Sequence, residues 1–135
     1  MIAVMPTAPD RLTVIVPASG DQLRPVRERL RAWLAARGVP RDLSQGVVLV
    51  TDEALANAIE HGYRDHAEPG SVDLTVRVEP EEVVVRVVDH GSWKPPATGS
   101  RGFRGRGLVI IKAMASWMGL VHTDRGTALT ASLPR

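Results

Sequence analysis

Residues 43–61 read LSQGVVLVTDEALANAIEH, and this stretch decides the fold. Its apolar side chains recur at helical spacing around most of the circumference, which is typical of a helix that is buried on more than one side. Asp42 or Ser44 can cap the start of this helix, and Gly62 ends it. We therefore expect a central helix against which the other elements pack.

The flanking segments show alternating strand and helix patterns. In chain order we predict a strand over 12–16, a helix over 22–37, the central helix, strands over 72–78 and 83–88, a helix over 107–118, and a hairpin of 120–123 with 127–133. This order lacks the simple alternation of a doubly wound fold. It favours an α+β two-layer sandwich with a mainly antiparallel mixed sheet and helices on one face. We expect residues 1–10 to be a flexible tail and residues 11–135 to be a single domain.

Composition narrows the function classes. The chain has 135 residues, 44% of them hydrophobic and 24% charged, as in an ordinary globular domain. It has no cysteine, which excludes disulfides and thiol catalysis. No apolar run is long enough to span a membrane and no signal-peptide pattern is present, so we expect a cytoplasmic protein. Aromatic residues make up 4%, which disfavours a base-stacking surface, and we expect no direct nucleic-acid binding.

The formal net charge is only +2, but the basic residues cluster. Residues 24–41 contain six Arg and one Glu, and residues 94–112 contain five basic residues and no acidic one. Such segments suit phosphate groups or an acidic partner surface. A solvated helix face is the alternative for residues 24–41, and a solvated loop is the alternative for residues 94–112.

Glu53, Asn57 and His61 lie four residues apart on the central helix and share one polar stripe, because a helix turns roughly 100° per residue. Leaving a buried polar group unpaired costs about 1–3 kcal/mol, so these side chains need partners. An Asn oxygen is a hard ligand that suits Mg²⁺, and a Glu one turn away can deprotonate a nucleophile. The alternative is that Glu53 and Asn57 bond to nearby backbone groups, and we expect His61 to cap or pack.

Two further polar residues lie at the boundaries of predicted strands. Asp89 follows an apolar strand, and its carboxylate can accept a hydrogen bond from an exocyclic amine such as that of adenine, while Gly91 lets a base approach the backbone. Thr127 follows the turn glycine Gly126, and its hydroxyl can reach a ligand or pair across strands. A plain turn remains the alternative for Asp89.

The segment Gly102-Phe-Arg-Gly105-Arg-Gly107 is rich in glycine and arginine and runs into a helix. Free backbone N–H groups, the helix dipole and the side chains of Arg104 and Arg106 together suit an anion. The spacing matches neither the dinucleotide fingerprint nor the lysine-containing phosphate loop. A flexible linker or a short RNA-binding segment is the alternative.

These motifs occur in a defined order: Glu53-x3-Asn57-x3-His61, Asp89-x-Gly91, Gly105-x-Gly107-Leu108 and Gly126-Thr127. The ordered set resembles the GHKL ATPase superfamily over residues 12–134. Within it, the chain is most similar to the small bacterial serine kinases that act as anti-sigma factors. The resemblance implies a histidine-kinase-like ATPase domain with the Bergerat fold, in which ATP lies between the helical layer and a lid.

The resemblance also implies a role for each matching residue. By role these are Glu53 as the general base, Asn57 as the Mg²⁺ ligand, Asp89 for the adenine amine with Thr127 in support, Gly91 beneath the base, Gly105, Gly107 and Leu108 where the lid meets its helix, and Arg104 and Arg106 as lid contacts. The implied cofactors are ATP and Mg²⁺. Trp93 stands where the family has a second glycine after Gly91, a departure that bears on turnover more than on nucleotide binding.

The implied function is a regulatory protein serine/threonine kinase. It would phosphorylate a serine of an antagonist protein, and it would sequester a sigma factor and so regulate transcription. The alternative is a non-catalytic nucleotide-binding switch that regulates a partner by binding alone. A homodimer is compatible with either hypothesis.

Overall fold

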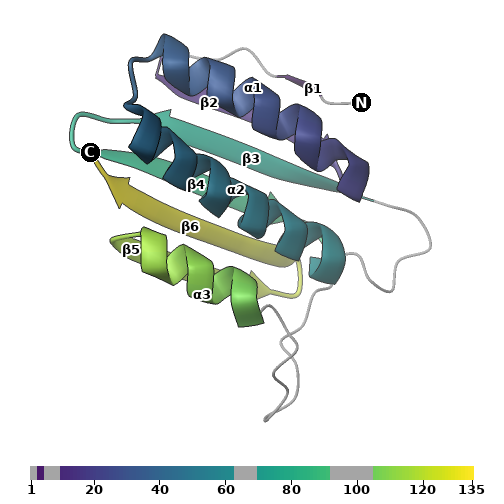
Figure 1. Ribbon diagram of the computed structural model, residues 1–135. Coiled ribbons are helices and arrows are strands. Elements are labelled where there is room, and N and C mark those ends of the chain that lie inside the picture. The colour runs from purple at the N-terminus through teal and green to yellow at the C-terminus, as the bar shows by residue number, and fades with distance from the viewer. Residues whose placement is uncertain (1–2, 5–9, 63–69, 92–104) are drawn as a thin grey trace.

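A computed structural model describes residues 3–4, 10–62, 70–91 and 105–135. Its strands are β1 (Ala3–Val4), β2 (Arg11–Pro17), β3 (Ser71–Val78), β4 (Glu82–Asp89), β5 (Trp117–Thr123) and β6 (Gly126–Pro134). Its helices are the 3-10 turn η1 (Gly20–Gln22), α1 (Leu23–Ala36), α2 (Arg41–Gly62) and α3 (Gly105–Met114). The three α-helices lie side by side on one face of a single sheet (Figure 1). The predicted α+β two-layer architecture is therefore confirmed.

The strands follow the order β1-β2-β3-β4-β6-β5, and every pair among the described strands is antiparallel. Alternate residues face the helices: Val14 lies opposite Leu74, Leu74 lies opposite Val87, and all three side chains are buried. β4 lies between β3 and β6. The core is thus the layer between the sheet and the helices.

Helix α2 runs between α1 and α3 above the sheet (Figure 1). It therefore buries side chains on several sides, and Val47, Val50 and Leu55 are almost fully inaccessible. This confirms the prediction of a central helix buried on more than one side. Helix α1 buries a single stripe and ends before Gly38, whose φ of 72° is a left-handed conformation that glycine adopts freely.

The predicted helix over 107–118 is wrong at both ends. Helix α3 begins at Gly105 and ends at Met114, and Trp117 already belongs to β5. Met118 lies opposite Ala131 of β6 and packs against the core from the strand. The apolar spacing that suggested a longer helix comes from two consecutive elements that face the same core.

The N-terminal segment also differs in part from the expected tail, because Ala3 and Val4 pair with Ile15 and Val14 of β2.

None of the helices in the described part of the chain is long and apolar enough to cross a membrane.

Candidate functional site

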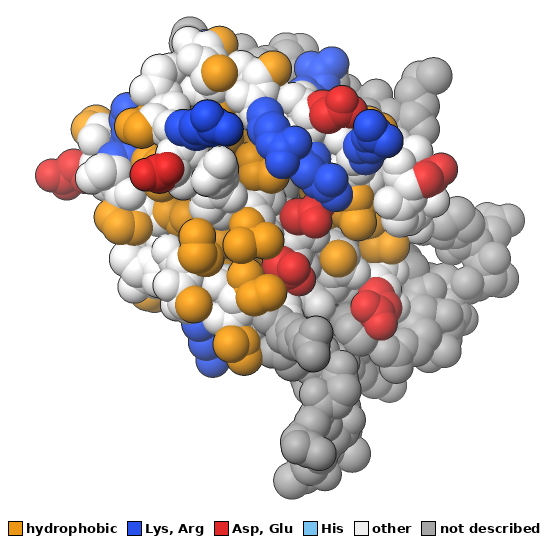
Figure 2. Space-filling view, viewed as in Figure 1, with side chains coloured by type: hydrophobic (Ala, Val, Ile, Leu, Met, Phe, Trp, Pro, Cys, Tyr) orange, Lys and Arg blue, Asp and Glu red, His pale blue; other side chains and the backbone are white. Residues whose placement is uncertain are grey.

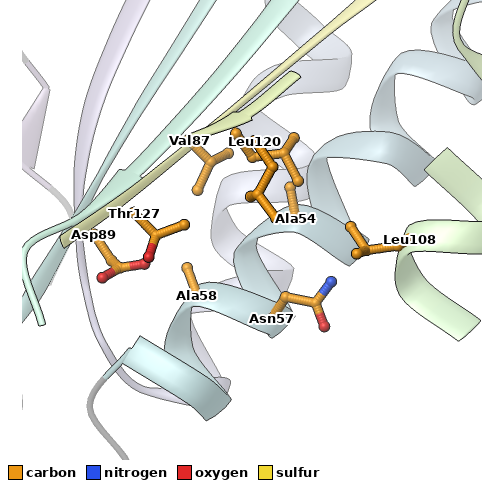
Figure 3. Close-up of a pocket in the computed structure, with 9 residues that line it drawn as sticks. Ala54, Asn57, Ala58, Val87, Asp89, Leu108, Leu120 and Thr127 are labelled. Atoms are coloured by element: carbon orange, nitrogen blue, oxygen red, sulfur yellow. The ribbon is translucent and has the colours of Figure 1, made fainter. Parts of the chain in front are cut away.

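A pocket lies between the sheet and helices α2 and α3 (Figure 3). Its lining residues are Ala54, Asn57 and Ala58 of α2, Val87 and Asp89 of β4, Leu108 of α3, Leu120 of β5, and Thr127 and Leu129 of β6. Most of these side chains are apolar. Asp89 and Thr127 lie together at the sheet side, and Asn57 projects from the facing helix (Figure 3). The pocket is therefore an apolar slot with polar groups on two sides.

Asp89 is held in place by its neighbours. Its side chain is buried, and its Oδ1 accepts a hydrogen bond of 3.1 Å from the backbone N–H of Gly91. The backbone N–H of Thr127, directly opposite on β6, also donates to this carboxylate. Burial raises the pKa of Asp89 above its ordinary value, and the two backbone bonds act in the opposite direction. Asp89 is thus an oriented, partly desolvated acceptor facing the pocket.

Thr127 connects this acceptor to the edge strand. Its hydroxyl Oγ1 lies 2.9 Å from Nδ1 of His122, which is directly opposite it on β5. The preceding residue, Gly126, has a φ of 142°, and its α-carbon lies against the backbone carbonyl of Asp89. The end of β4, the β5–β6 turn and the Thr127 hydroxyl therefore form one packed unit.

Asn57 lies across the pocket on α2, and its amide points toward α3 (Figure 3). Its Nδ2 atom is buried and has no hydrogen-bond partner among the described residues. The amide lies against the α-carbon of Gly107, close to the start of α3. An unpaired buried amide costs free energy, so a bound group that pairs with it would be stabilised. The unpaired amide of Asn57 fits a ligand that is rich in oxygen atoms and carries a cation. Its N–H group can donate to a ligand oxygen, and after a half-turn of the side chain the amide oxygen can bind the cation instead.

The structure thus brings together four of the predicted site residues, Asn57, Asp89, Leu108 and Thr127, and places Gly91 and Gly107 beside them. Glu53 is half-buried one turn before Asn57 on α2, and it does not line the pocket. Gly105 is the first residue of α3. Arg104 and Trp93 lie outside the described residues, and the side chains of His61 and Arg106 are not described.

The sequence alone did not identify His122 or the apolar walls of the pocket as parts of the site. His122 belongs to no motif in the sequence, but a hairpin that turns at 124–125 places it opposite Thr127, which is a usable signal. The apolar walls Val87, Leu120 and Leu129 carried no signal of their own, because the same residues would serve equally well in the core.

The arginines of the basic segment over 24–41 lie at the surface of the fold. Arg side chains gather over α1 and its border with α2 (Figure 2). Arg27 and Arg31 line a hollow between the two helices, and Arg27 bonds to Asp52 of α2 at 3.2 Å. The surface is therefore built from both helices.

The chain matches the model of the histidine kinase-like ATPase domain over residues 16–133, and it belongs to this family. Its relatives include the serine-protein kinase RsbW of Staphylococcus epidermidis, with 23% identity over 87 residues, or 64% of this chain and 55% of the relative. The chain therefore spans about half the length of the curated relatives it matches.

Among solved structures, the chain resembles the crystal structure of the RsbU and RsbW domains of Rv1364c from Mycobacterium tuberculosis. The TM-score is 0.73 at 26% identity, covering 95% of this chain and 32% of that one. It also resembles the histidine kinase domain of the blue-light activated histidine kinase of Erythrobacter litoralis EL346, with a TM-score of 0.55 at 18% identity, over 87% of this chain and 61% of that one. The second likeness supports the shared fold alone.

Proposed function

We propose that this chain binds ATP with Mg²⁺ in the pocket between the sheet and α2, and that it is an anti-sigma-factor-type serine kinase. The observation that carries the proposal is the buried carboxylate of Asp89 at one side of an apolar slot, with the unpaired amide of Asn57 at the α3 side of the same slot. A flat heteroaromatic ring with an exocyclic amine fits a slot of this kind, because the walls bury the ring and the carboxylate accepts from the amine.

The phosphate side of the site would lie at Asn57 and the start of α3. Gly107 leaves room there for the Asn57 amide, and the first turn of a helix has N–H groups free to meet an anion. No three His, Cys, Asp or Glu residues of the described segments cluster as a metal site. A cation held by Asn57 would therefore take most of its ligands from phosphate oxygens and water, as Mg²⁺ commonly does.

For phosphoryl transfer, Mg²⁺ supplies charge neutralisation on the phosphates. A substrate serine Oγ would form a bond to the γ-phosphorus as the bond from that phosphorus to the β–γ bridging oxygen breaks, and ADP would leave. Glu53 would accept the serine proton, since it lies one turn from Asn57 on the same face of α2. The substrate would be a serine of an antagonist protein, as the resemblance to RsbW suggests.

A second candidate is a nucleotide-binding switch without phosphoryl transfer. The position of Glu53 outside the pocket lining favours it, because a general base must come within hydrogen-bond reach of the attacking hydroxyl. In both hypotheses the basic surface over α1 and α2 would bind an acidic partner protein. The candidate partners are a sigma factor and an antagonist protein. In both hypotheses the protein would act in the cytoplasm.

The test combines binding and transfer. Isothermal titration of the folded protein with ATP should give heat that depends on Mg²⁺, and Asn57→Ala should weaken the Mg²⁺-dependent part. Labelled γ-phosphate should then appear on the serine of an antagonist protein encoded nearby. Binding without transfer to any candidate would select the switch, and the absence of binding would reject both hypotheses.

A further inference from the structure

His122 lies on the same face of the sheet as the pocket. Leu120, two residues before it on β5, and Leu129, two residues after Thr127 on β6, both line the pocket, and alternate residues of a strand share a face. The Thr127 hydroxyl therefore borders the pocket and is bonded to the imidazole, with Oγ1 and Nδ1 2.9 Å apart.

A threonine hydroxyl has one hydrogen and two lone pairs, and by itself it rotates to suit its neighbours. An imidazole partner removes this freedom. If the ring nitrogen accepts, the hydroxyl hydrogen is consumed and the pocket sees only lone pairs. If the ring N–H donates, a lone pair is consumed and the hydrogen remains for a ligand.

We infer that His122 is a positioning residue for purine recognition: its Nδ1–H donates to Oγ1 of Thr127, which turns the Thr127 hydroxyl into a hydrogen-bond donor toward the ring nitrogen beside the adenine amine. This inference rests on the proposed ATP site and deepens it.

The neighbouring groups explain why a donor is needed. Asp89 faces the pocket as an acceptor, and it already engages the backbone N–H groups of Gly91 and Thr127. On adenine, the amine is a donor and the adjacent ring nitrogen N1 is an acceptor, so the second position requires a donor. The Thr127 hydroxyl is directly beside Asp89, since the two residues are paired across β4 and β6. Guanine presents the reverse pair, a carbonyl and a ring N–H, and would meet mismatches at both positions.

The experiment measures a ratio of affinities. ATP and 1-deaza-ATP, in which a C–H replaces N1, are titrated calorimetrically into the wild type, His122→Leu, His122→Asn and Thr127→Val. One neutral hydrogen bond corresponds to roughly a three- to tenfold preference for ATP in the wild type. Thr127→Val should bring the ratio close to one, because it removes the donor. His122→Leu should lower the ratio, because the hydroxyl it releases can also turn its hydrogen toward other acceptors. His122→Asn should restore the preference, because its amide can donate from a position near that of Nδ1.

Thr130→Val is the matched control, because it makes the same change on β6 at a residue opposite Gly119, away from the pocket lining. It should keep the wild-type ratio. If the wild type binds no adenine nucleotide, the proposed function itself fails. If the wild type binds ATP but shows no preference, or if His122→Leu keeps the full preference, or if His122→Asn does not restore it, the positioning role of His122 is overturned while ATP binding stands.

Discussion

The amide of Asn57 occupies the space that a side chain at residue 107 would need. A β-carbon built on Gly107 would lie 2.6 Å from Nδ2 and 3.2 Å from Oδ1 of Asn57, both of them atoms at the end of a side chain. Helices α2 and α3 therefore approach each other at the site, and the glycine sets how far the Asn57 side chain can extend. A larger residue can be accommodated only if the amide moves.

We expect Gly107→Ala to separate binding from folding. Alanine favours a helix over glycine by about 0.5–1 kcal/mol, which offsets the displacement of a flexible side-chain end, so the melting temperature should stay close to that of the wild type. The displaced Asn57 amide should lower the affinity for Mg²⁺ and ATP by about tenfold or more, measured by calorimetry. Gly20→Ala is the control, because no atom lies within 4 Å of its β-carbon. An unchanged affinity in Gly107→Ala would contradict the placement of Asn57 in the site.

The sequence predicted the elements better than it predicted their ends. Period-two and helical patterns identified every strand except β1, because a buried face imposes its period on the residues that fill it. The end of α3 was missed because Met118 faces the core in either conformation, and pairing with Ala131 across the sheet decided between them. Such a long-range pairing leaves no local trace in the sequence.

The site was predictable where a polar residue interrupts an apolar element. Asn57 and Asp89 stand out on this ground, and the structure brings both to one pocket. His122 did not stand out, because it gains its contact only through the register of a hairpin. The absence of a β-carbon at Gly126 likewise matters only in the folded protein, where the backbone carbonyl of Asp89 on β4 lies against this residue.

Glu53→Gln should separate transfer from binding. Because Glu53 lies outside the pocket lining, its neutralisation should leave the affinity for ATP within about twofold of the wild type. As the proposed proton acceptor it should support transfer to serine, so the rate should fall by about 10²–10⁴-fold. Glu60→Gln makes the same change on an exposed residue of the same helix and should transfer at the wild-type rate. Equal rates in both variants would remove Glu53 from the mechanism.

Asp89→Asn should stabilise the fold while it weakens binding. Burial raises the pKa of Asp89, so between its unfolded and folded pKa values the folded protein binds more protons than the unfolded chain. The stability associated with this group is therefore fully present below the unfolded pKa and is lost as the pH rises through the folded pKa. The asparagine variant avoids this loss, so it should unfold at a higher denaturant concentration than the wild type at neutral pH.

The difference between wild type and Asp89→Asn should shrink as the pH falls toward the ordinary pKa of an aspartate. Affinity for ATP should drop by about 10–100-fold, since a charge-assisted hydrogen bond contributes about 1.5–3 kcal/mol. Asp10→Asn changes an exposed carboxylate and should alter neither quantity. An Asp89→Asn variant that is less stable than the wild type at neutral pH would show that the backbone bonds to the carboxylate outweigh its burial.

Gly126→Ala should destabilise the fold through the site itself. With a φ of 142°, the backbone at Gly126 strains any residue with a side chain, at about 1–3 kcal/mol. The new β-carbon would also lie 2.0 Å from the carbonyl oxygen of Asp89, a backbone atom that cannot rotate away. Gly38→Ala shares the positive φ but has open space around its β-carbon, so it should show the strain alone. Chemical denaturation of the two variants gives the difference, and equal losses would mean that the β5–β6 turn can move away from Asp89 at little cost.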